Sequence, residues 1–281
     1  MSSPQAQPQR VRCRQIAPAD FEALAGLLAR GFPRSTPGYW IRGFARMAAL
    51  PEIEGVPRFG YLLENDGVAV GAILLIFAMS GGGETAHIRA NLSSWYVEPE
   101  FRSHSTLLVS MATKLKHVTY LNISPAPHTL KTLEAQGFQC CNDGQFAFVA
   151  ALVPGGGQVH APAPGDPDYE LLAAHQGYGC ESLICEQGGT RHPFVFKPRR
   201  LAMPPVKVME LIYCRSMGDF ARCAGALGRH FLRRGFLGVI GDGPLPGRIG
   251  KYFPGKEPRY FKGPHRPHLN DLAFTEKVLF G

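Results

Sequence analysis

The first half of the chain alternates strand-like and helix-like segments, and this alternation limits the fold more than any other feature. Short apolar runs predict strands, and apolar residues spaced three and four apart predict amphipathic helices. From residue 11 to residue 153 the predicted order is β-α-α-β-β-β-α-β-α-β, which is typical of an α/β fold with a mixed sheet. The strands are predicted at 11–16, 59–63, 68–77, 87–97, 118–123 and 146–153, and the helices at 20–28, 38–50, 106–116 and 128–136.

A Pro- and Gly-rich stretch divides the chain near residue 160. Residues 154–168 read PGGGQVHAPAPGDPD and lack a periodic apolar pattern, so they predict a linker. Two domains are expected, at 11–153 and 169–281, after a disordered lead-in at 1–10. The second has the predicted order α-β-β-β-α-β…β, which echoes the first and favours a tandem of two units, although no sequence identity supports a repeat. Its elements are predicted at 169–175, 183–185, 193–197, 206–213, 220–234 (capped by Asp219), 236–240 and 272–280.

Three short segments carry a resemblance to a known family. The run WYVEPEFR at 95–102 resembles the V-x-P-x-x-R signature of the GNAT (Gcn5-related N-acetyltransferase) superfamily. The opening at 11–20 resembles the family's first strand and helix start, and AQGF at 135–138 resembles its G-F after the fourth helix. The resemblance covers the first half of the chain. It implies a GNAT-like fold, acetyl-CoA or another acyl-CoA as co-substrate, and acyl transfer to an amine or hydroxyl of an unidentified acceptor.

The resemblance also assigns a coenzyme-binding loop. In the family, the loop after the signature strand wraps the coenzyme pyrophosphate with backbone N–H groups and a helix N-terminus. Here Ser105 and Leu107 stand where the family's loop has glycines. The residues assigned to coenzyme binding are Tyr96, Val97, Arg102, Ser103, His104, Ser105, Thr106 and Leu107.

The catalytic pattern of the family is incomplete in this chain. The family's general acid is a tyrosine four residues before the G-F glycine, and Leu133 at that position cannot donate a proton. Three residues on or just after the strand at 87–97 are candidates for the base or for substrate contacts: His87, Asn91 and Glu98. An imidazole with an ordinary pKa of about 6.5 suits base catalysis. A histidine that alternates with apolar residues along a strand is more often structural.

The positive charge is concentrated in the second half. The net charge is +8, and the segment from Arg191 to Arg266 holds 16 basic and four acidic residues. Such a field favours an anionic partner, whether coenzyme A, an acidic carrier protein, a nucleic acid or a lipid surface, and is also compatible with a solvated basic face. A second anion site is predicted at Arg215, Ser216 and Gly218, between a strand and a helix. The run at 250–263 mixes aromatic and basic residues and could bind nucleic acid or form a packed loop. No RNP, KH or helix-turn-helix pattern accompanies it, which argues against nucleic acid.

The composition excludes several classes of protein. The seven cysteines are odd in number and form no C-x-x-C pair, which argues against a disulfide framework and a zinc site. No apolar stretch has the ~20 residues of a membrane span, and no apolar leader opens the chain, so a cytoplasmic protein is expected. Two functions remain: an acyltransferase, or a degenerate, non-catalytic GNAT-like protein that binds an acyl-CoA, another anionic ligand or a protein partner. The altered loop and Leu133 favour the second, whereas a reaction that depends mainly on positioning favours the first.

Overall fold

The computed structural model describes residues 11–153, 155–202 and 205–281. Their packing divides them into two compact units. The first holds residues up to Asn122 together with Phe280, and the second holds residues 123–279 and Gly281. The predicted domain limits, 11–153 and 169–281, stay a prediction.

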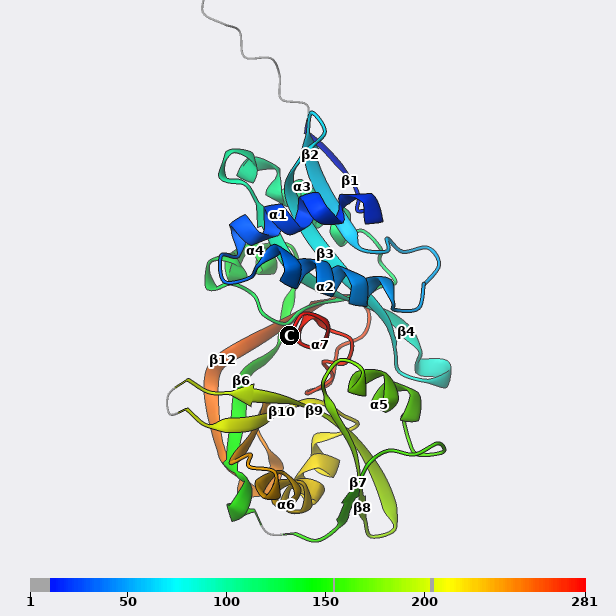
Figure 1. Cartoon of the computed structure of the whole chain (residues 1–281), viewed down its shortest axis with the longest axis vertical. Coiled ribbons are helices and arrows are strands. Elements are labelled where there is room, and N and C mark those ends of the chain that lie inside the picture. The colour runs from blue at the N-terminus through cyan, green and yellow to red at the C-terminus, as the bar shows by residue number, and fades with distance from the viewer. Residues whose placement is uncertain (1–10, 154, 203–204) are drawn as a thin grey trace, which may run out of the picture. The chain divides into compact units, whose positions relative to one another are not determined.

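In its described residues, the first unit is a five-stranded mixed sheet with three α-helices (Figure 1). The strand order is β1-β2-β3-β4-β5, antiparallel except for the parallel pair β4–β5. The predicted α/β fold with a mixed sheet is thus confirmed. The elements are β1 (Val11–Gln15), α1 (Phe21–Gly31), α2 (Pro37–Ala48), β2 (Gly60–Asn65), β3 (Val68–Ser80), β4 (His87–Val97), α3 (Ser105–Ala112) and β5 (Thr119–Asn122).

Strand β4 diverges from β5 and carries a bulge. Its pairing with β5 spans only residues 89–91, opposite residues 119–121, whereas β4 continues to Val97. Against β3, Ser94 and Trp95 together oppose Ile73, which is one residue too many for a regular ladder. Ser94 has a φ of 53°. A left-handed conformation costs a non-glycine residue about 1–3 kcal/mol, so the surrounding sheet must hold Ser94 in place.

The second unit is a seven-stranded sheet in the order β12-β6-β11-β10-β9-β8-β7. Helix α6 packs against it, and the ring of Phe220 lies 5.5 Å from that of Phe146 and 5.9 Å from that of Phe194. The elements are α4 (Leu130–Ala135), β6 (Gln139–Val149), β7 (Gln158–His160), α5 (Tyr169–Gln176), β8 (Glu181–Gln187), β9 (Thr190–Arg200), β10 (Lys207–Cys214), α6 (Met217–Arg233), β11 (Gly238–Asp242), β12 (Lys251–Lys262) and α7 (Glu276–Leu279).

The two units repeat one pattern of strand pairing. In the first, β1–β2, β2–β3 and β3–β4 are antiparallel and β4–β5 is parallel. In the second, β7–β8, β8–β9 and β9–β10 are antiparallel and β10–β11 is parallel. The fourth strand of each series, β4 or β10, also carries a register irregularity, between Leu211 and Tyr213 in β10.

Three predicted elements differ from the structure. Residues 272–280 form no strand: Asp271 makes a single bridge to Tyr213, and α7 follows. Leu272 and Ala273 are both buried, and so are Val278, Leu279 and Phe280, which is incompatible with the alternation of a half-buried strand. Residues 251–262 form the strand β12 rather than a loop, and the predicted linker contains the short strand β7.

Candidate functional site

The segment after β4 turns directly into α3. Residues Pro99–His104 form a 3₁₀ helix, which runs into α3 at Ser105. The backbone N–H of Phe101 donates to the carbonyl of Glu98, and that of Ser105 donates to the carbonyl of Arg102. Those two N–H groups are therefore satisfied within the chain and do not point freely at a ligand.

The side chains of this predicted loop are open to solvent. Arg102 is exposed, and among the described residues it forms no ion pair. Leu107 is 42% exposed, so its side chain projects outward from the first turn of α3. The Ser103 hydroxyl lies 3.2 Å from Nδ1 of His104. The predicted residues 102–107 thus lie together at the start of α3. Among the described residues, the guanidinium of Arg102 has no carboxylate partner there.

Glu98 is held by two partners at the end of β4. The Tyr96 hydroxyl donates to Oε2 of Glu98 at 2.8 Å, and Nε of Arg30 donates to Oε1 at 2.8 Å. Burial raises the pKa of Glu98, but these two hydrogen bonds outweigh it and hold the pKa below its ordinary value. Burial and the bond to Glu98 raise the pKa of Tyr96. Glu98 is therefore an ionised carboxylate with both oxygens engaged.

The three catalytic candidates lie far apart along β4. At ~3.3 Å per residue, Asn91 lies about 13 Å along the strand from His87, and Glu98 lies about 23 Å beyond Asn91. His87 opens the strand opposite Ser80, and its Nδ1 lies 3.0 Å from the carbonyl of Thr85. They therefore do not form one constellation, and at most one of them lies at any single reacting centre.

Asn91 has a structural role at the point where β4 and β5 separate. It is only 2% exposed, and its side-chain amide donates to the carbonyl of Leu92 at 3.1 Å and to that of Leu121 at 3.3 Å. Leu121 is its partner in the last pair of the β4–β5 ladder. The amide therefore bridges the two strands where the backbone ladder ends.

Leu133, at the position of the family's tyrosine, lies in α4 and is fully buried. It packs in the second unit as an ordinary core residue.

Comparison with solved structures identifies the fold. A GCN5-related N-acetyltransferase from Anabaena variabilis matches with a TM-score of 0.62 over 90% of this chain and 72% of that chain, at 10% identity. One from Kribbella flavida matches with a TM-score of 0.57 over 90% of this chain and 71% of that chain, at 14% identity. The chain has the GNAT fold. No protein-family model and no curated protein sequence matches it.

The likeness to GNAT structures extends beyond the first unit. Eis1 from Mycobacterium abscessus matches with a TM-score of 0.51 and 11% identity, over 90% of this chain and 73% of that chain. Because each of these matches covers about nine tenths of the chain, the GNAT likeness includes residues of both units.

The arginine of the second predicted anion site is neutralised by a carboxylate of the chain itself. Arg215 donates to both oxygens of Asp168, at 2.7 and 2.8 Å. These hydrogen bonds raise the pKa of Arg215, and the pKa of Asp168 is lowered because its bonds to Arg215 and Tyr213 outweigh burial. The Ser216 hydroxyl accepts from the backbone N–H of Asp219 at 3.1 Å. Ser216, rather than the predicted Asp219, is thus the N-cap of α6.

Replacing Ser216 by alanine is expected to destabilise the protein by about 1 kcal/mol, because the substitution removes the side-chain acceptor at the start of α6. Urea unfolding followed by circular dichroism measures this change. The matched control is Ser103→Ala, in an exposed serine outside any cap, for which a change within about 0.5 kcal/mol is expected. Equal stability of Ser216→Ala and the wild type would contradict the capping role.

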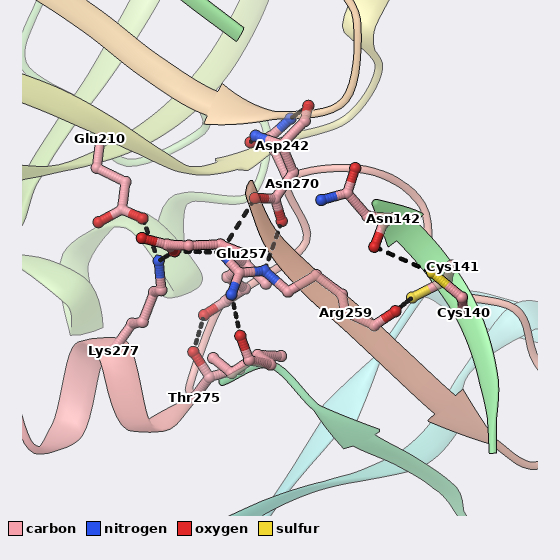
Figure 2. Close-up of polar contacts among 12 residues, drawn as sticks. Cys140, Cys141, Asn142, Glu210, Asp242, Glu257, Arg259, Asn270, Thr275 and Lys277 are labelled. Atoms are coloured by element: carbon pink, nitrogen blue, oxygen red, sulfur yellow. Dashed lines mark hydrogen bonds and ion pairs between the residues drawn. The ribbon is translucent and has the colours of Figure 1, made fainter. Parts of the chain in front are cut away.

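A buried ionic network in the second unit was not anticipated from the sequence (Figure 2). Arg259, 3% exposed, donates to both oxygens of Asp242 at 3.0 and 3.1 Å and to Glu257 at 2.9 Å. Lys277 pairs with Glu210 and Glu257, and Arg199 pairs with the same two carboxylates at 3.2 and 3.1 Å.

The charges of this network compensate one another, which indicates a structural role. Its three carboxylates face three cations, and the side-chain amide of Asn270 accepts from the N–H of Asp242 and donates to its carbonyl. Burial raises the pKa of Glu257, but Lys277, Arg259 and Arg199 hold it well below its ordinary value. Two of the basic residues predicted to attract a partner, Arg199 and Arg259, are therefore neutralised inside the unit.

Neither a metal centre nor a membrane span occurs in the described part of the chain. Within those ranges, no group of three or more His, Cys, Asp or Glu side chains is placed to hold a metal ion. Across the same ranges, no helix is both long enough and apolar enough to cross a bilayer.

Proposed function

We propose that this protein is an acyl-CoA-dependent acyltransferase, which transfers an acyl group, most simply acetyl, to an amine or hydroxyl of a small or macromolecular acceptor. The observation that carries the proposal is the divergence of β4 from β5 beside a bulge at Ser94, in a chain with the GNAT fold. Diverging parallel strands open the sheet, and a bulge removes backbone groups from the ladder and directs them elsewhere.

The proposed reaction is direct attack within this opening. The acceptor nitrogen or oxygen bonds to the thioester carbonyl carbon, the C–S bond breaks, and the sulfur leaves as a thiolate. Backbone N–H groups at the β4 bulge stabilise the negative charge on the carbonyl oxygen. The acceptor proton passes through solvent to the leaving thiolate. Glu98, the candidate nearest the coenzyme loop, is a weak base, because Arg30 and Tyr96 engage both its oxygens and hold its pKa below the ordinary value.

Coenzyme binding is proposed at Arg102, with contacts from Tyr96 to Leu107. The Arg102 guanidinium is exposed and unpaired among the described residues, so it is available for a phosphate.

The second unit is proposed to be a diverged GNAT-like unit, because its strands repeat the pairings of the first.

A non-catalytic, ligand-binding function is the alternative. Two observations favour it: Leu133 replaces the proton donor, and the N–H groups of Phe101 and Ser105 are satisfied within the chain.

Calorimetric titration with acetyl-CoA and with acyl-CoAs of longer chain tests the proposal, together with detection of released thiol in the presence of a panel of amines. Saturable binding and amine-dependent thiol release are expected. Binding without release for any amine would favour the non-catalytic alternative. The absence of binding to every acyl-CoA would exclude the acyltransferase.

A further inference from the structure

An apolar pocket of about 880 Å³ lies in the second unit, between β6, β10, β11 and the start of β12. Pockets that bind small organic ligands commonly have volumes of ~300–1,000 Å³. None of the residues that line it belongs to the proposed coenzyme loop or to the catalytic candidates, so the two proposals are tested separately.

The pocket occupies the face of the sheet opposite α6. Phe146 and Phe148 of β6 point into the core beneath α6. Because side chains alternate along a strand, Ala147 and Val149 point to the other face. The register pairs Ala147 with Ile240 and Val149 with Gly238, so these four residues form the floor of the pocket.

Two features of the sequence leave this face hollow. Ala147 and Gly238 place almost no side-chain volume in the middle of the floor. The connection from β11 to β12 contains only the three-residue turn Pro246–Arg248, whereas the connection from β5 to β6 contains the helix α4. The β11–β12 connection thus lacks the helix that the β5–β6 connection has at the same step of the pairing pattern.

Four large apolar side chains in the walls of the pocket are exposed to solvent and lie close together. Leu152 is 77% exposed, Val149 52%, Leu237 49% and Phe253 36%, and all four line the same pocket. A contiguous apolar hollow of this kind is unfavourable in water and typically marks a binding site.

One cation lies among this apolar lining. Lys251 is the only charged residue among the described side chains that line the pocket. It is exposed, it pairs in register with Ala147, and its Nζ lies 5.4 Å from the centre of the Phe253 ring. Among the side chains that the structure describes, the pocket lining therefore combines a long apolar surface with one positive charge.

We propose that this pocket binds a long-chain fatty acid, with the hydrocarbon chain over Ala147 and Gly238 and the carboxylate beside Lys251. The one ammonium group matches the single charge of a carboxylate. An acyl-CoA carries several phosphate charges that this lining does not match. A concave hollow also suits one flexible chain better than the flat surface of a bilayer or of another copy of the protein.

The affinity for monomeric carboxylates tests the proposal. We expect calorimetry with octanoate, decanoate and dodecanoate, each kept below its micellar concentration, to show about fourfold tighter binding per added methylene until the pocket is filled. Absence of binding by the wild type to all three would overturn the proposal.

Variants locate the ligand. Ala147→Phe fills the floor and is expected to weaken decanoate binding at least tenfold. Leu237→Gln makes one wall polar at similar volume and should weaken it as well, so a folding defect in one variant does not decide the result. Unfolding curves establish that each variant is folded. Undiminished binding by both folded variants would overturn the proposal.

The position of the carboxylate is tested separately. Lys251→Gln should weaken decanoate binding about twofold to fivefold, in the range of an exposed ion pair, and leave binding of the uncharged 1-decanol unchanged. Lys256→Gln, an exposed lysine of the same strand outside the pocket, is the matched control and should change neither. Equal effects of the two substitutions on decanoate would contradict the proposed orientation.

Two further outcomes would assign the face to another occupant and overturn the proposal. One is sedimentation with phosphatidylglycerol vesicles but no binding of monomeric carboxylates. The other is self-association that Ala147→Phe abolishes, again without carboxylate binding.

Discussion

Replacing Arg259 by methionine is expected to destabilise the protein by about 3–5 kcal/mol, because the substitution leaves the buried carboxylate of Asp242 without its cation. Both side chains of this pair are 3% exposed, so water cannot replace the lost guanidinium. Arg259 also donates to Glu257 and to the carbonyl of Ile123, and these bonds are lost as well. Urea unfolding followed by circular dichroism measures the change.

The matched control is Lys256→Met in the same strand, where an exposed cation is removed and a change within about 0.5 kcal/mol is expected. The double variant Asp242→Leu with Arg259→Met removes both charges. It should be more stable than Arg259→Met alone, because no buried charge is left uncompensated. If Arg259→Met were no more destabilising than Lys256→Met, the network would not have the structural role that its compensated charges indicate.

The elements predicted correctly are those whose local signals agree with their packing. Asp66 and Gly67 both have positive φ at the β2–β3 turn, as the Asp-Gly pair predicts. The apolar run at 206–213 forms β10, which is buried over most of its length. The signature at 95–102 correctly marks the end of the fourth strand and the turn toward α3.

Strand β12 illustrates a failure caused by tertiary packing. Pro254 and Pro258 have no N–H, and Gly255 adopts a positive φ, so the local sequence indicates a loop. In the structure, the register between β12 and β6 shifts between Pro254 and Tyr260, and this shift accommodates the two prolines and the glycine. The strands pair regularly before Pro254 and after Tyr260. The pairing partner lies more than a hundred residues earlier in the chain, and no local pattern identifies it.

The candidate site was predictable only in part, for the same reason. Residues 102–107 are contiguous, so a motif identifies them together. The bonds from Arg30 to Glu98 and from Arg215 to Asp168 join residues that are far apart in sequence. These hydrogen bonds determine which arginine side chains remain available for an anionic ligand. They depend on the folded structure, so the sequence alone does not identify them.

Replacing Arg102 by alanine is expected to weaken acetyl-CoA binding by about 1.5–3 kcal/mol, the range for a hydrogen bond to a charged group. The reason is that Arg102 is exposed at the start of α3 and, among the described residues, has no carboxylate partner that would compete with a phosphate. Arg215→Ala is the matched control. Its guanidinium already donates to both oxygens of Asp168, so its loss should change acetyl-CoA affinity little. Calorimetry on both variants separates the two sites. Unchanged affinity in Arg102→Ala together with weakened binding in Arg215→Ala would place the coenzyme at the start of α6 instead.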